Sequence, residues 1–246
     1  MIKKVLILIV CLGLLSCQDT KTKKSKPQKT EKNTEEETAI NPELRNQILS
    51  STKKKTAVWD TITTVDQIHL KPFLEDYGKK NPETRAVIKT TYGEIEIELF
   101  TDTPWHRANF VRLAKLDYFN TTYFYRVTKD FVIQAGNSDN RITGKMRNAI
   151  GDYLIPQEFN KKHLNTYGAV GAAKFSKQNV SKASSPFEFY IVMDKNGAHH
   201  LDFEHTVFGR VIRGMDVAQK INQVETDEQS DWPVDNIQVT IDLIEK

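Results

Sequence analysis

The stretch with the clearest potential for chemistry covers residues 123–137 and reads YFYRVTKDFVIQAGN. It holds two apolar, strand-like runs, residues 123–127 and 131–135, separated by a short polar turn. Arg126 lies inside the first run and Gln134 inside the second. A guanidinium among aromatic and β-branched neighbours is unfavourable unless it is paired or used. Arg126 is therefore either a structural arginine bonded to backbone carbonyls or a cation with a function.

The same residues resemble the signature of the cyclophilins, which are peptidyl-prolyl cis-trans isomerases. Their pattern is aromatic-x-Arg, a short turn and Phe-x-x-Gln-x-Gly, and it is met by Phe124, Arg126, Phe131, Gln134 and Gly136. A second match, to aromatic-Leu-Asp-x-x-His-x-x-Phe-Gly, runs from His200 through Leu201, Asp202 and His205 to Phe208 and Gly209. Shorter matches are Glu98-Leu99-Phe100, Asn109-Phe110 and Ile155-Pro156-Gln157-Glu158-Phe159. The resemblance covers about residues 85–246.

The resemblance implies an enzyme that twists X-Pro peptide bonds. Rotation about this bond is slow because it breaks C–N conjugation, and a cation that hydrogen-bonds the proline nitrogen favours the twisted state. Arg126 is the expected cation, and Gln134 is expected to orient it and to hold the substrate. An apolar pocket would exclude water from the amide. The resemblance places the following residues there or beside it: Phe131, Val132, Ala173, Lys174 (through its backbone), Tyr190, His200, Leu201 and His205. No cofactor or metal is required.

Four positions depart from the family pattern. His200 stands where many members have tryptophan, Tyr190 for phenylalanine, Glu188 for glutamine and Lys174 for asparagine. Because the tryptophan contacts cyclosporin in family members, we predict weak inhibition by that ligand. Nanomolar inhibition of the purified domain would contradict this expectation.

Two alternatives compete with the enzyme. His199, His200, Asp202, Glu204 and His205 could form a metal cluster, but the Leu-Asp-x-x-His match explains them better as a polar surface. A non-catalytic cyclophilin-like module, a chaperone or assembly factor that binds proline-containing segments, is the stronger rival, because a fold does not certify an activity. The arginine favours the enzyme, since binding alone does not need its charge.

The amino terminus predicts export. Lys3 and Lys4 precede an apolar run of signal-peptide length, too short to span a membrane. The run ends in Leu-Leu-Ser before Cys17, which resembles the bacterial lipobox, in which this cysteine carries the lipid. We therefore expect a signal peptide over residues 1–16 and a lipoprotein held by Cys17 to a membrane of the bacterial cell envelope, at the periplasmic face or the outer membrane.

Residues 17–56 are rich in Lys, Thr, Glu and Ser, the composition of a flexible tether. Residues 57–84 are more apolar and predict a short helical lead-in that packs on the main domain, residues 85–246. With cysteines only at positions 11 and 17, no disulfide can form in that domain. The near balance of 35 basic and 32 acidic residues gives no reason to expect nucleic-acid binding. We expect a monomer with proline-containing polypeptides as its partners.

The main domain is predicted to be all-β. Alternating apolar residues over 94–100 and 237–243, with other short runs between them, are typical of half-buried strands. Thr103 and Pro104 predict the start of a helix that ends near residue 115, and a second helix is expected from residue 214 to 221. Gly168 and Gly171 allow close backbone approach, and residues 137–151 read as irregular. The resemblance implies that these strands form a closed eight-stranded antiparallel barrel capped by two helices.

Overall fold

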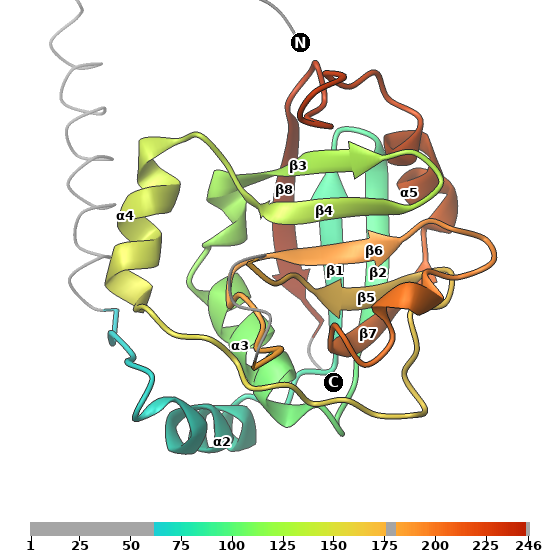
Figure 1. Ribbon diagram of the computed structural model, residues 1–246. Helices are drawn as coiled ribbons and strands as arrows, with labels where there is room; N and C mark the ends of the chain where they lie inside the picture. Colours follow the sequence, from blue (N-terminus) through green and yellow to red (C-terminus); the bar gives the residue numbers. More distant parts are fainter. Residues whose placement is uncertain (1–61, 176–180, 245–246) are drawn as a thin grey trace, which may run out of the picture. The chain divides into compact units, whose positions relative to one another are not determined.

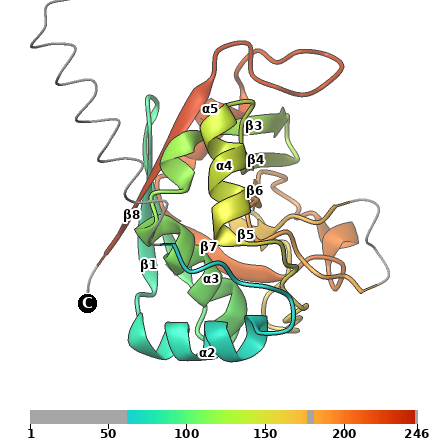
Figure 2. The same ribbon diagram turned by 90° about the vertical axis from the view of Figure 1, so that its left-hand side faces the viewer.

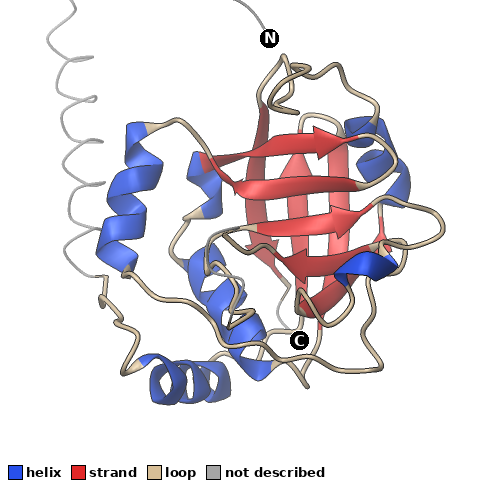
Figure 3. Ribbon diagram, viewed as in Figure 1, coloured by secondary structure: helices blue, strands red, loops and turns tan. Residues whose placement is uncertain are grey.

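The computed structural model describes residues 62–175 and 181–244 of the 246-residue chain. Within these ranges eight antiparallel strands close into a barrel in the order β1-β2-β7-β5-β6-β4-β3-β8 (Figures 1 and 3). The strands are β1 (Arg85–Thr90), β2 (Gly93–Leu99), β3 (Thr122–Thr128), β4 (Val132–Asn137), β5 (Ala169–Ala172), β6 (Phe189–Val192), β7 (Val207–Arg213) and β8 (Ile237–Leu243). The predicted closed barrel is confirmed. Closure removes free sheet edges, so every strand is paired on both sides.

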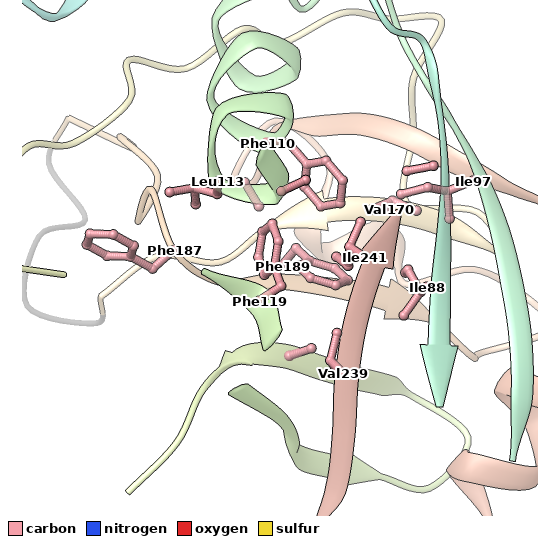
Figure 4. Packing of buried hydrophobic residues seen from close by; sticks show 14 of the residues in the cluster. Ile88, Ile97, Phe110, Leu113, Phe119, Val170, Phe187, Phe189, Val239 and Ile241 are labelled. Carbon is pink, nitrogen blue, oxygen red and sulfur yellow. The ribbon is translucent and has the colours of Figure 1, made fainter. Parts of the chain in front are cut away.

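The barrel interior is filled by one side of each strand. On β2, for example, Ile95, Ile97 and Leu99 are buried. Helix α3 (Pro104–Lys115) adds Phe110, whose ring centroid lies 5.0 Å from that of Phe119 and 5.5 Å from that of Phe189 (Figure 4). These aromatic contacts hold α3 against the core, as aromatic pairs at such distances are attractive.

Helices α3 and α5 (Met215–Asn222) lie at opposite ends of the barrel (Figure 1). Both were predicted, and α3 begins at Pro104 after Thr103 as expected. The cap differs from the prediction, because the Thr103 side chain makes no capping bond. Instead, Glu158 accepts the backbone N–H groups of Trp105 and His106, at 3.0 and 2.9 Å. A carboxylate at the N-terminus of a helix also interacts favourably with the positive end of the helix dipole.

Residues 137–151, expected to be irregular, contain helix α4 (Arg141–Ile150), so that expectation was wrong. The Asn140 side chain accepts the N–H of Ile142 and caps the helix start. Thr143, Met146 and Ile150 form its buried face. Because the buried face has few apolar residues and the segment is otherwise polar, the sequence does not indicate a helix here. Two short 3-10 turns, η1 (Phe119–Thr121) and η3 (His199–Leu201), complete the helical parts of the described chain.

The lead-in wraps around α3. In the described part, residues 62–69, which we call the strap, run without helix or strand and end in a turn before α2 (Leu70–Lys80). Helix α2 lies beside α3 (Figure 2), with Leu70 and Leu74 buried in the main core. The strap reaches α4, where the N–H of Val65 donates to the carbonyl of Ile150 at 3.0 Å. Residues 1–61, with the expected signal peptide, Cys17 and tether, lie outside the described residues. No described helix is long and apolar enough to cross a membrane.

Candidate active site

The site is built on a row of residues that crosses four neighbouring strands. Arg126 of β3 is the register partner of Gln134 of β4, which pairs with Tyr190 of β6, which pairs with Gly171 of β5. The next cross-strand pair, Val127 with Ile133, belongs to the barrel core. Because side chains alternate between the faces of a sheet, the row lies on the outer face of the barrel.

A β-bulge puts Arg126 on that face. Phe124 and Val127 are both buried in the core, although strict alternation would send residues three apart to opposite faces. The register shift between Phe124 and Arg126 resolves the conflict by adding one residue to β3. Bulges of this kind re-aim side chains next to active sites. As a result, Tyr125 and Arg126 both lie opposite Gln134 on the outer face, and neither points into the barrel interior.

Apolar residues gather beside this row in a second cluster, separate from the barrel core. We call it the outer apolar cluster. It consists of Val132, Ala169, Tyr190, Val192, Ala198 and Val207, with Phe100, Phe131 and Leu201 packed against it. Four of the residues predicted for the proline pocket, Phe131, Val132, Tyr190 and Leu201, thus meet in one place. An apolar surface with a cation at its edge is suited to bind an uncharged ring next to a polar amide.

Two histidines border the outer apolar cluster. The ring of His200 stacks on Phe131 at 5.3 Å between centroids, and His205 meets Tyr190 edge-on at 5.6 Å. Nδ1 of His205 lies 3.0 Å from the carbonyl oxygen of Ala172 and donates to it, because a carbonyl can only accept. Burial lowers the pKa of His205, so its ring is neutral near pH 7.

Tyr190 is accommodated without bringing a polar group into the cluster. Its hydroxyl is buried and donates to the Asn165 side chain at 2.7 Å, and burial raises the pKa of Tyr190. Gly171 makes room for the ring, since a Cβ at this position would lie 2.2 Å from the Tyr190 Cζ atom. The predicted close approach at Gly171 is thus an approach by this tyrosine.

Arg126 and Gln134 have different partners from those expected. Nε of Arg126 lies 3.4 Å from Asp231 Oδ2, in a pair whose side chains are 37% and 38% exposed. The Gln134 amide nitrogen donates to the hydroxyl of Tyr125 instead of supporting Arg126. Within the described ranges, therefore, Asp231 orients the arginine.

The structure fixes Asp231 firmly. Its backbone φ is +58°, a left-handed value that is uncommon for a residue other than glycine. Its carbonyl accepts the N–H of Val127 at 2.8 Å, and its carboxylate accepts the Thr128 hydroxyl at 2.8 Å. Asp231 lies 105 positions from Arg126 along the chain, and sequence reasoning missed it, as no local pattern marks such a partner.

The remaining predicted residues lie around the same face. Ala173 is buried, and its carbonyl accepts the N–H of Ser185 at 2.8 Å. The Lys174 side chain is turned to Glu204 at 3.2 Å, and Lys182 also pairs with Glu204. In the proposed metal cluster, Asp202 bonds instead with His199 and Asn165. No group of three or more His, Cys, Asp or Glu side chains in the described ranges is arranged to hold a metal ion.

A buried Ser–His–Glu array elsewhere has a structural role. Ser184 Oγ lies 2.9 Å from His106 Nε2, and His106 Nδ1 lies 2.6 Å from Glu158. The distances are those of a hydrolytic triad, yet the serine is fully buried and Glu158 also caps α3. Without access to a substrate, the array serves to connect the start of α3 to the loop at Ser184.

Comparison with known proteins agrees with this arrangement. The family model described as "Cyclophilin type peptidyl-prolyl cis-trans isomerase/CLD" matches residues 85–242. Peptidyl-prolyl cis-trans isomerase cypE of Dictyostelium discoideum is 32% identical over 64% of this chain and 95% of its own length. Peptidyl-prolyl cis-trans isomerase-like 2 of Rhizopus delemar is 35% identical over 69% of this chain, which spans only 31% of that longer protein.

A solved structure shares the fold. The cyclophilin-type isomerase of Cryptosporidium parvum superposes with a TM-score of 0.55 at 23% identity, over 67% of this chain and 99% of the other. The same protein was also solved in the presence of the dipeptide Ala-Pro. The chain therefore belongs to the cyclophilin-type peptidyl-prolyl cis-trans isomerases.

Proposed function

We propose that this isomerase acts on X-Pro bonds of cell-envelope proteins and assists their folding, with Arg126 as the catalytic group. Rotation of the X-Pro amide crosses a barrier of about 18–20 kcal/mol. In the twisted state the proline nitrogen regains its lone pair and can accept a hydrogen bond. A guanidinium keeps its protons at all relevant pH values, so Arg126 stabilises the twisted state more than either planar form.

The observation that carries this proposal is the unused hydrogen-bonding capacity of Arg126. Buried arginines of the described chain use theirs on backbone carbonyls. Arg107 donates to the carbonyls of Gly78, Asn81 and Glu83, and Arg112 to those of Thr63 and Ile150. In the same ranges no group accepts a hydrogen bond from the Arg126 guanidinium, whose one partner is Asp231 in the ion pair. This argues against the structural alternative and leaves its donors for a substrate.

The outer apolar cluster supplies the second half of the mechanism. Phe131, Val132 and Leu201 offer an apolar surface on which a proline ring can exclude water. Water exclusion strengthens the contact between the guanidinium and the amide nitrogen. The dipeptide Ala-Pro, used with the Cryptosporidium parvum protein, is a substrate-like fragment of the kind that this surface would take.

A comparison of two arginine variants tests the catalytic role. One charge-assisted hydrogen bond contributes about 1.5–3 kcal/mol, so Arg126→Ala should lower kcat/KM by about ten- to a few hundredfold. The control is Arg210→Ala, since Arg210 is also exposed and paired with a carboxylate, Glu98, at 2.8 Å. It should leave kcat/KM and the melting temperature unchanged. Wild-type activity in Arg126→Ala would refute the assignment.

The location in the envelope rests on the sequence around Cys17, which precedes the described residues. The expected form is a lipoprotein whose tether lets the barrel reach newly exported chains. Expression with radiolabelled palmitate should label the protein and bring it to the membrane fraction, whereas Cys17→Ser should be unlabelled and soluble. The alternative substitution Cys11→Ser is the control and should behave as wild type. Labelling of the Cys17→Ser protein would contradict the proposal.

A further inference from the structure

A polar network joins Gln134 of the site to helix α4. The amide nitrogen of Gln134 donates to the Tyr125 hydroxyl, and this hydroxyl donates to Glu188 at 3.3 Å. The other carboxylate oxygen of Glu188 accepts from Arg147 of α4 at 2.9 Å. The network therefore links β3, β4 and the residue just before β6 to a helix that the sequence did not predict.

Arg147 is the charged partner of the buried Glu188 carboxylate. The Glu188 side chain is 8% exposed, and a carboxylate so far from water needs a charged partner. The Arg147 guanidinium is itself held from three sides, since it donates to the Tyr118 hydroxyl and to the Gly136 carbonyl, each at 2.9 Å, and lies over the ring of Phe187. The pair thus fixes helix α4 to the chain just before β6.

A charged Glu188 fixes the direction of every hydrogen bond in the network. An ionised carboxylate can only accept, so the single hydroxyl proton of Tyr125 is donated to it. The remaining capacity of this hydroxyl is to accept, and the neighbour that meets it must donate. Gln134 can donate only through its nitrogen, and its carbonyl oxygen is therefore directed away from Tyr125.

We propose that Tyr125, Glu188 and Arg147 are positioning residues that hold the Gln134 amide in one orientation, with its oxygen as an acceptor toward the substrate-binding face. Arg126, the register partner of Gln134, lies on the same face. The acceptor is thus placed for a peptide N–H of the substrate, next to the X-Pro amide that rotates. This inference rests on the proposed role of Gln134 in the site.

The protonation state of Tyr125 agrees with this arrangement. Burial, followed by the negative charge of Glu188 and the hydrogen bond to it, raises the pKa of Tyr125. The hydroxyl therefore remains a donor throughout the neutral range. A neutral amide in place of the carboxylate could donate or accept a hydrogen bond. The Tyr125 hydroxyl could then donate to Gln134 instead of accepting from it, and the Gln134 amide could turn over.

The decisive experiment is a double-mutant cycle on the full mature chain with Tyr125→Phe and Gln134→Ala. Removing the hydroxyl should lower kcat/KM by about three- to tenfold when Gln134 is present. In the Gln134→Ala background the same change should have almost no effect, because the residue acts through the glutamine. The control is Tyr123→Phe, on the same strand, whose hydroxyl has no hydrogen-bond partner among the described residues. It should leave activity unchanged.

NMR of the Gln134 side-chain amide supplies a readout that a general loss of structure would not produce. In the wild type its two protons should be distinct and slow to exchange, whereas in Tyr125→Phe and in Glu188→Gln they should exchange faster. Arg147→Met alone should destabilise the fold, and adding Glu188→Gln should recover the part of the melting temperature that is lost to the unpaired carboxylate, but not the slow exchange.

Two results would overturn the inference. If Tyr125→Phe and Gln134→Ala lower kcat/KM independently, so that their effects multiply, Tyr125 does not act through Gln134. If Gln134→Ala alone has wild-type kcat/KM, the proposed role of Gln134 fails and the inference fails with it. Arg126→Ala reports separately on catalysis, so the isomerase mechanism can survive either result.

Discussion

At the scale of single residues, the position of Arg126 depends on one extra residue in β3. Phe124 and Val127 are both buried in the core, and only the bulge between them lets Arg126 face outward. Residue types draw attention to Arg126 and Gln134 inside apolar runs, and the resemblance to the cyclophilin signature makes them candidates. They do not reveal the bulge or the partners Tyr125 and Asp231, since these depend on strand register and on a loop distant in the sequence.

Asp231→Asn should weaken catalysis without weakening the fold. Asparagine tolerates the left-handed backbone and can still accept the Thr128 hydroxyl, but it no longer attracts Arg126. An exposed ion pair contributes about 0–1 kcal/mol, so we expect kcat/KM to fall by up to about fivefold. The melting temperature should stay within about 2 °C. The matched control is Asp242→Asn on β8, which removes an exposed ion pair with Lys89 of β1. Equal activity in both variants would show that Asp231 does not hold Arg126.

His205 should titrate below its ordinary pKa of 6.5. Burial is the main cause, and the charges of Lys174 and His200 act in the same direction, against the Ala172 carbonyl and Glu204. Because the unfolded chain takes up this proton first, the neutral ring stabilises the fold above pH 6.5, and that contribution is lost as pH falls toward the folded pKa. An NMR titration of the His205 ring measures the midpoint directly.

The same pKa shift should appear in the activity. If the neutral ring is the form that borders the proline pocket, kcat/KM stays level from pH 8 to pH 6.5 and declines only at lower pH. Substituting His205→Gln, which keeps a polar donor but does not titrate, should remove that decline. A ring midpoint at or above 6.5 would contradict the effect of burial described here.

At the scale of elements, strands are predictable here and the added helices less so. Apolar residues alternate clearly in β2 and β8, and Pro104 marks the start of α3, so their approximate bounds follow from the sequence. Helix α4 has only three large apolar residues, Ile142, Met146 and Ile150, and reads as a polar loop. Its stability comes from contacts with distant segments, namely the strap at Val65 and the ion pair with Glu188.

Two glycine substitutions test how closely the strap packs against the C-terminal end of α4. Gly151 has φ +124°, and a Cβ there would lie 1.9 Å from the carbonyl oxygen of Val65. Gly151→Ala should therefore destabilise the protein by about 2 kcal/mol or more. Gly144 lies within α4, and no atom beyond the neighbouring backbone of the helix comes within 4 Å of its Cβ position, so Gly144→Ala should stabilise by about 0.4–1 kcal/mol. Denaturant unfolding measures both, and similar values for the two would contradict this close packing.

At the scale of the whole described unit, the folding domain starts before the family match does. The family model begins at residue 85, yet Val65, Leu70 and Leu74 belong to the same core cluster as the barrel. Arg107 and Arg112 on α3 also depend on carbonyls of the lead-in. A closed barrel needs no further strand, but its α3 side has an apolar surface and two cations that the strap and α2 cover.

Truncation should therefore distinguish the family boundary from the physical one. A chain that begins at residue 62 should melt like the mature protein, whereas one that begins at residue 85 loses three buried apolar side chains, each contributing about 1.5–3 kcal/mol. The arginines would also lose acceptors, and the sum is comparable with the whole stability of a domain, about 5–15 kcal/mol. We expect the shorter chain to melt at least about 10 °C lower or to fail to fold. If it melts within about 2 °C of the longer chain, the lead-in covers the barrel without stabilising it, and the strap would be part of the tether instead of the domain.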